Sequence, residues 1–131
     1  MHGRIPAGAL VLLRTGWDRH WGNLLAYFGD STPGDASKLH FPSFGDDAAR
    51  LLVEKRQAAG LGVDTPSIDY GSSTDFAVHR ILAARQGVGP ENLTGIDRLP
   101  PTGALLIALP MKIEKGSGGP VRVAALVPRQ R

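Results

Sequence analysis

The sequence has no cysteine among its 131 residues. This absence excludes disulfide bonds, thiolate metal ligands and cysteine nucleophiles. Long apolar runs are also missing, since runs such as Ala104 to Leu109 are far too short to cross a membrane. The G-x-S-x-G pattern of serine hydrolases is absent as well. Membrane insertion and Ser-His-Asp chemistry therefore have no support in the sequence.

Basic residues are not grouped in the way that nucleic-acid binding requires. The formal net charge is +3 and the pI is near 9.7, yet the basic side chains are scattered, with a modest group only at Arg122, Arg129 and Arg131. No aromatic residues are interleaved with that group. The pattern predicts a solvated surface with a basic tail and no nucleic-acid partner.

Two stretches resemble a signal peptide and a phosphate-binding loop only in part. The apolar run near the start covers only Ala7 to Leu13, and no small-x-small cleavage site follows it, so we expect no signal peptide and a cytoplasmic protein. The glycine-rich stretch Gly116 to Pro120 lacks the Lys-Ser/Thr of a phosphate-binding loop and leads into a strand. Nucleotide binding is therefore not expected.

The length predicts a single domain over residues 1–131 with a core of its own. Apolar runs and turn residues predict the order β-α-α-β-α-β-β, which is an α/β arrangement with at most four strands. The predicted strands are Ala9–Thr15, Leu61–Asp64, Ala104–Leu109 and Val121–Val127. The predicted helices run from about Arg19 to Tyr27, Asp46 to Ala59 and Asp75 to Arg85.

The third predicted helix has a defined start and a defined core face. Ser72, Ser73 or Thr74 is expected to cap it. Its apolar positions, which should face the core, are Phe76, Val78, Ile81 and Leu82.

Other boundaries carry weaker signals. Asp46 is expected to cap the second helix and Gly60 to end it. The runs Ala9–Thr15 and Ala104–Leu109 are typical of strands that are buried on both faces. Gly29 to Lys38 is rich in turn residues and is expected to form a surface loop.

His79 and Glu91 are the sharpest candidates for chemistry. They are separated by the rest of one helix and a turn bounded by Gly89 and Pro90, which can fold the carboxylate back towards the imidazole. A histidine and a carboxylate can share one metal ion, although two ligands alone make a poor site. The alternative is a surface histidine and a helix-capping glutamate, each satisfied by water or backbone.

Further carboxylates lie in the same stretch, at Asp64, Asp69 and Asp75. Asp64 directly follows a strand, where site residues of open α/β sheets are common, but it could equally hold the Thr-Pro turn. Asp18 and His20 do not face each other on a helix, so a ligand pair there is not expected.

Short motifs over nearly the whole chain, in order, resemble the second half of the cyclase or kynurenine formamidase-like metal-dependent hydrolases. The motifs are Ile5–Trp17, His40–Pro42, Gly62–Asp69, His79, Glu91–Leu93, Leu99–Pro100, Ala108–Ile113 and Gly118–Leu126.

This resemblance implies a fold, an activity and a ligand pair. The implied fold is the swivelling β/β/α type, here a truncated α/β fold with a mixed sheet and flanking helices, assembled as homo-oligomers. The implied activity is metal-dependent hydrolysis of a small-molecule amide such as N-formylkynurenine, a reaction of tryptophan catabolism. The residues matching family ligands to zinc or manganese are His79 and Glu91. No catalytic or substrate-binding residue is assigned.

The principal metal motif of the family, His-x-Gly-Thr-His-x-Asp-x-Pro, is absent. Catalytic zinc takes about three protein ligands, so the metal is expected to bind weakly or not at all unless a second chain supplies the missing motif. Three interpretations stay open. The chain is a partial amide hydrolase completed by another polypeptide, an inactive remnant that serves as a binding or assembly module, or a small basic binding domain with an incidental likeness.

Overall fold

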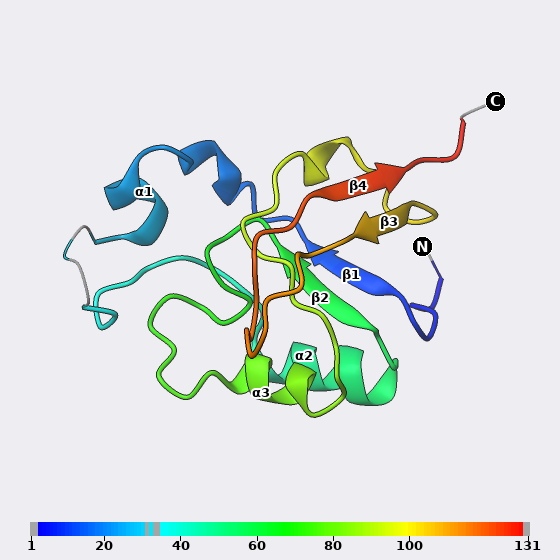
Figure 1. Ribbon diagram of the computed structural model, residues 1–131, viewed down its shortest axis with the longest axis horizontal. Helices are drawn as coiled ribbons and strands as arrows, with labels where there is room; N and C mark the ends of the chain where they lie inside the picture. The colour runs from blue at the N-terminus through cyan, green and yellow to red at the C-terminus, as the bar shows by residue number, and fades with distance from the viewer. Residues whose placement is uncertain (1–2, 31, 33–34, 130–131) are drawn as a thin grey trace. The chain divides into compact units, whose positions relative to one another are not determined.

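The computed structural model describes residues 3–30, 32 and 35–129. These residues form two compact units, one from Gly3 to Asp97 and one from Arg98 onwards. The predicted order β-α-α-β-α-β-β with four strands is confirmed (Figure 1). Parts of the predicted loop 29–38 and of the basic tail, namely residues 31, 33, 34 and 131, lie outside the described residues. One domain over the whole chain stays a prediction.

Two parallel strands lie at the centre of the first unit. Strand β1, Leu10–Leu13, pairs with β2, Gly60–Val63, and Figure 1 shows them side by side. The β2 strand is fully buried, whereas β1 is only partly buried, so the expected burial of the first strand on both faces is not reached. At Gly60 a side chain would collide with Leu10 and with the backbone of Val88, which explains why glycine is needed there.

A third segment runs along the other edge of β2 without becoming a regular strand. The N–H groups of Leu61 and Val63 donate to the carbonyls of Val88 and Pro90, and Gly60 and Val88 form a parallel bridge. Pro90 has no N–H to return, so the ladder is interrupted at that residue. The chain therefore leaves the strand geometry just where Glu91 begins.

Two short helices cover one side of these strands. Helix α2, Asp46–Arg50, continues into a π-helical turn, η2, over Leu51–Lys55, and α3 spans Ala77–Ala83 on the same side of β1 and β2 (Figure 1). The core formed by these elements contains Phe44, Ala49, Val53, Leu61, Val63, Ile68, Val78, Ile81 and Leu82. Three of the four apolar positions predicted for α3 therefore face the core.

The fourth position, Phe76, was predicted wrongly. It precedes α3 in a left-handed conformation with φ 50° and is 56% exposed. The expected cap from Ser72, Ser73 or Thr74 is also wrong, because the carboxylate of Asp69 accepts hydrogen bonds from the first-turn N–H groups of Val78 and His79. A residue of the preceding turn thus accepts the backbone N–H groups that an N-terminal cap usually accepts.

The other two predicted helices are present near the expected residues, but their boundaries differ from the prediction. The helix expected over Arg19–Tyr27 is a 3₁₀ turn, η1, at Trp17–His20 followed by α1, Leu24–Phe28. The second helix begins at Asp46 after Gly45 rather than being capped by Asp46, and Gly60 opens β2 instead of ending the helix. The described residues contain no helix long and apolar enough to cross a membrane.

A 3₁₀ turn, η3, covers Ile96–Arg98 where the first unit ends and the second begins. The second unit contains an antiparallel pair of strands. Strand β3, Leu105–Ala108, pairs with β4, Val123–Leu126. The strand predicted over Ala104–Leu109 is therefore present, but its burial is wrong, since three of its four residues are exposed. Parallel and antiparallel pairings both occur, in two small sheets.

Candidate metal-binding site

The carboxyl end of β2 gathers the candidate residues of the first unit. Asp64 follows β2 directly, and the segment that carries Glu91 is tied beside it, since the N–H of Asn92 donates to the carbonyl of Thr65 over 2.9 Å. The first turn of α3 brings His79 to the same place. Residues that follow parallel strands meet at one edge, which is where open α/β sheets place their sites.

His79 and Glu91 lie next to each other. Nε2 of His79 is 3.4 Å from Oε1 of Glu91, while the histidine side chain is 46% exposed and the glutamate 27%. This separation is longer than an ordinary N–H···O hydrogen bond of about 2.7–3.2 Å. The structure therefore brings His79 and Glu91 together, at a distance slightly longer than a hydrogen bond.

Asp69 holds the other side of the histidine ring. Its Oδ2 lies 2.5 Å from Nδ1 of His79 and also accepts the backbone N–H of His79 over 3.1 Å. Its Oδ1 accepts the N–H of Val78 over 2.8 Å, and the side chain is 2% exposed. Asp69 was grouped in the sequence with nearby carboxylates, but its pairing with His79 was missed. The one available signal was an aspartate in the turn ahead of α3, and Ser72, Ser73 and Thr74 offered nearer capping residues.

Glu91 is fixed by the turn that follows β2. Its Oε1 accepts the N–H of Ile68 over 2.9 Å. That turn is itself fastened, because the carbonyl of Ser67 accepts hydrogen bonds from the hydroxyls of Ser43 and Thr65. The carboxylate of Glu91 therefore keeps its place by a backbone contact as well as by its own segment.

Asp64 accepts hydrogen bonds from the residues that follow β1. Its carboxylate accepts the N–H and the hydroxyl of Thr15 over 3.0 and 2.6 Å, and the N–H of Gly16 over 2.7 Å. These contacts join the end of β1 to the end of β2 and bury the group to 1% exposure. Asp64 thus holds the turn after β1, which is neither the site role nor the local Thr-Pro turn considered for it.

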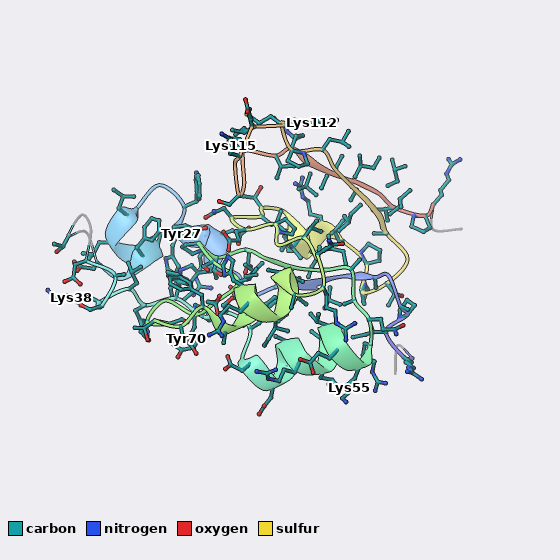
Figure 2. All side chains as sticks on the ribbon, turned by 60° about the horizontal axis from the view of Figure 1, so that its bottom comes forward. Tyr27, Lys38, Lys55, Tyr70, Lys112 and Lys115 are labelled. Atoms are coloured by element: carbon teal, nitrogen blue, oxygen red, sulfur yellow. The ribbon has the colours of Figure 1, made fainter. Side chains whose placement is uncertain are left out.

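Tyr27, a residue of α1 that Figure 2 labels, contacts the residue after Glu91. Its hydroxyl lies 2.8 Å from Oδ1 of Asn92, and its side chain is buried. Burial, followed by the negative charges of Asp64, Asp18 and Glu91, raises the pKa of Tyr27 to about 12. The phenol is therefore a neutral donor at physiological pH. Nothing in the sequence pointed to this contact.

The distance between His79 and Glu91 fits two ligands of one metal ion. In tetrahedral zinc coordination, nitrogen and oxygen ligands about 2.0–2.2 Å from the ion are about 3.4 Å apart, which is the separation of Nε2 and Oε1. A ring nitrogen held by a carboxylate on its far side is also the usual arrangement around metal-binding histidines. In the part of the chain that the structure describes, no group of three or more His, Asp or Glu side chains is arranged to hold an ion.

The remaining candidates lie apart from this pair. Asp75 is exposed and its carboxylate is 3.3 Å from the hydroxyl of Ser73. His20 belongs to η1, where its ring contacts the edge of Trp17. Asp18 lies in the same 3₁₀ turn as His20.

Fold and site together define a mixed α/β protein with a histidine and a carboxylate at the carboxyl edge of a parallel strand pair. A family model described as "Putative cyclase" matches residues 1–70, just over half of the chain. The chain belongs to the cyclase family. Hydrolases of this family are generally metal-dependent.

Named relatives agree with this assignment. Isatin hydrolase of Roseibium aggregatum is 36% identical over 132 aligned residues, which cover 98% of this chain. Kynurenine formamidase of Salinibacter ruber is 42% identical over 62 residues, or 47% of the chain. Isatin hydrolase A from Ralstonia solanacearum has a similar structure, with a TM-score of 0.86 and 39% identity over 97% of this chain.

An isatin hydrolase bound to the product analogue thioisatinate also matches, with a TM-score of 0.87 and 36% identity over 98% of this chain. In each of these comparisons with isatin hydrolases, the chain spans about half of the relative, namely 48% of its length. The resemblance to a cyclase-family fold is thus shown for the chain, with about half of each relative lying outside the match.

Proposed function

We propose that the chain contributes His79 and Glu91 to the metal site of a cyclase-family hydrolase that opens an amide bond. The observation that carries this proposal is the 3.4 Å separation of Nε2 and Oε1, with the opposite ring nitrogen held by Asp69. The assignment of both residues as ligands to zinc or manganese agrees with this geometry and with the family.

A divalent metal, when bound, supplies Lewis acidity for the attack of water on an amide carbonyl. The contribution of this chain is to hold two donor atoms in place. Glu91 keeps its orientation through the N–H of Ile68, and His79 keeps its orientation through Asp69. Because catalytic zinc takes about three protein ligands, we propose that a second chain or segment completes the site.

The proposed substrates are small-molecule amides with an aromatic ring. One relative is named for isatin, a cyclic amide, and another for a formamide of kynurenine. Both names imply cleavage of an amide bond next to an aromatic group. The similarity to isatin hydrolases extends over 98% of this chain and that to kynurenine formamidase over 47%, which favours the cyclic amide as the first substrate to test.

A second candidate function is a non-catalytic binding or assembly module. The observation that favours it is the small number of possible metal ligands, since the described residues offer no group of three metal-binding side chains. The two functions predict different behaviour towards metals and substrates, and can therefore be separated by one set of measurements.

The test is metal analysis of the purified chain together with hydrolysis of isatin and of N-formylkynurenine. For the partial hydrolase we expect weak binding of Zn²⁺ or Mn²⁺ and turnover only after a chain carrying the His-x-Gly-Thr-His-x-Asp motif is added. His79→Ala and Glu91→Ala should each abolish that turnover. The matched control is Asp75→Ala, an exposed carboxylate in the same unit, which should leave it unchanged.

Three outcomes would contradict the proposal. Tight stoichiometric metal and full turnover in the isolated chain would show that the site is complete. Retained turnover in both His79→Ala and Glu91→Ala would reject these residues as ligands. Absence of metal binding and of turnover with every partner tested would favour the non-catalytic module.

A further inference from the structure

We propose that Asp69 is a positioning residue, which fixes His79 in the tautomer with the proton on Nδ1 and thereby directs the lone pair of Nε2 at Glu91. The consequence for metal binding rests on the proposed function. The tautomer itself is a property of the chain alone and can be measured without metal.

Asp69 is far more buried than Glu91, and its contacts define its role. Both oxygens are engaged, Oδ1 by the N–H of Val78 and Oδ2 by the N–H and the ring of His79. The side chain is 2% exposed, so a metal ion has no open approach to it. All of its hydrogen bonds instead position the start of α3 and the imidazole that α3 carries.

The two distances around the imidazole decide between the tautomers. A carboxylate has no proton to donate, so its contact with a neutral ring nitrogen is favourable only where that nitrogen carries hydrogen. Nδ1 lies 2.5 Å from Asp69, whereas Nε2 lies 3.4 Å from Glu91. If the proton were on Nε2, the lone pair of Nδ1 would meet the carboxylate of Asp69 at the shorter distance. The only hydrogen bond of the ring would then be the long one, from Nε2 to Glu91. The shorter contact therefore places the proton on Nδ1.

In the neutral ring with that proton on Nδ1, Nε2 and Oε1 are two electron-pair donors 3.4 Å apart. Such a pair is repulsive when empty and favourable with a cation between the two atoms. The same carboxylate also begins the helix, since no side chain of the residue before α3 provides a cap. The ring orientation is thus tied to the backbone of α3 and is established when the chain folds.

The first test is a nitrogen-proton correlation spectrum of the imidazole rings in the full, metal-free chain. It is recorded at a pH above which the ring signals no longer change, so that the neutral rings are observed. We expect the Nδ1–H form for His79 in the wild type. In Asp69→Asn we expect the Nε2–H form, which free histidine prefers in water, because one amide oxygen cannot replace two carboxylate oxygens.

The matched control is Asp64→Asn. Asp64 is an equally buried carboxylate that also accepts backbone N–H groups, but its recorded contacts are with Thr15 and Gly16 rather than with His79. Its substitution should lower stability while leaving the Nδ1–H form of His79 intact. A shift of the tautomer in Asp64→Asn as well would mean that general loosening is the cause, which overturns the proposal.

A wild-type spectrum with His79 in the Nε2–H form would also overturn it, and this measurement stands even where Asp69→Asn does not fold. The second test adds Mn²⁺ alone and follows the broadening of the His79 ring signals. Asp69→Asn should need about 10–100-fold more Mn²⁺ for equal broadening, the usual effect of losing such a partner. Equal broadening in both proteins overturns the positioning role, whereas failure of substrate turnover alone would count only against the hydrolase.

Discussion

The hydroxyl of Tyr27 donates a hydrogen bond of 2.8 Å to the side-chain oxygen of Asn92, the residue immediately after Glu91. The two residues are 65 positions apart in sequence. Asn92 adopts a left-handed conformation with φ 55°, and its N–H donates to the carbonyl of Thr65. The backbone beside Glu91 is therefore held from two directions, by α1 and by the turn after β2.

Replacing Tyr27 by phenylalanine should lower the free energy of unfolding by about 1 kcal/mol, because one buried hydrogen bond is lost. Urea denaturation measures the change. Tyr70→Phe is the control, since Tyr70 is largely exposed on the turn between β2 and α3 (Figure 2), and it should change stability by less than about 0.5 kcal/mol. Equal losses in the two variants would contradict the role of the Tyr27 hydroxyl.

The stability of the chain should fall in the alkaline range through Tyr27. The pKa of Tyr27 is raised from 10.0 to about 12, so the folded state holds this proton more tightly than the unfolded state does. The stabilising contribution is complete below pH 10.0 and is lost as the pH rises towards 12. Unfolding measured across this range should show the decline in the wild type and a shallower one in Tyr27→Phe. Parallel curves for the two proteins would refute the assignment.

Asp64→Ala should be strongly destabilising, on the order of 3 kcal/mol, because donors from Thr15 and Gly16 lose a buried charged acceptor. Thermal or urea unfolding measures this loss. Asp75→Ala removes an exposed carboxylate and should cost less than about 0.5 kcal/mol. A mild effect at position 64 would mean that water replaces the carboxylate between the ends of β1 and β2.

Gly60→Ala should destabilise the chain by about 1–3 kcal/mol through overpacking. The added methyl group would meet the side chain of Leu10 and the carbonyl oxygen of Val88, on the two sides of β2. Gly118→Ala is the control, because a methyl group there meets nothing within 4 Å. Indistinguishable denaturation midpoints for the two variants would show that β2 can move away from its neighbours.

We propose that the chain forms homo-oligomers through the apolar face of the β3–β4 pair. Leu105 and Leu126 are register partners and both are exposed, as is Ile107. An exposed apolar face of this kind favours association, and a two-stranded sheet is marginally stable by itself. Light scattering should give a dimer or larger species, and Leu105→Lys combined with Leu126→Lys should shift it towards monomer. A monodisperse wild-type monomer would reject this proposal.

The order of elements could be predicted from the sequence because apolar runs and turn residues repeat with clear periods. Burial could not, since it depends on neighbours that the pattern does not contain. The run Ala104–Leu109 has the composition of a buried strand, yet most of β3 is exposed. Phe76 has the spacing of an apolar helix position, yet its backbone adopts a left-handed conformation and its side chain is exposed to solvent.

The sequence indicated part of the candidate site, and the other part depended on contacts that no local pattern encodes. A helix and a turn allowed the pairing of His79 with Glu91 without requiring it, and the family resemblance favoured it; the two side chains lie 3.4 Å apart. Asp69 was visible as a carboxylate but not as the partner of Nδ1, since that requires knowing where α3 begins. The contact from Tyr27 joins distant segments, and no periodic pattern encodes it.

The residues that hold His79 and Glu91 in place are close to them in sequence. Asp69 precedes the histidine by 10 positions, and the bond between Ile68 and Glu91 spans 23. Contacts of such low sequence separation form with little loss of chain entropy and favour fast folding. One continuous stretch therefore carries the imidazole, its orienting carboxylate and the second donor. The orientation of the imidazole should therefore depend less on distant segments than the backbone beside Glu91 does, since Tyr27 holds that backbone from 65 positions away.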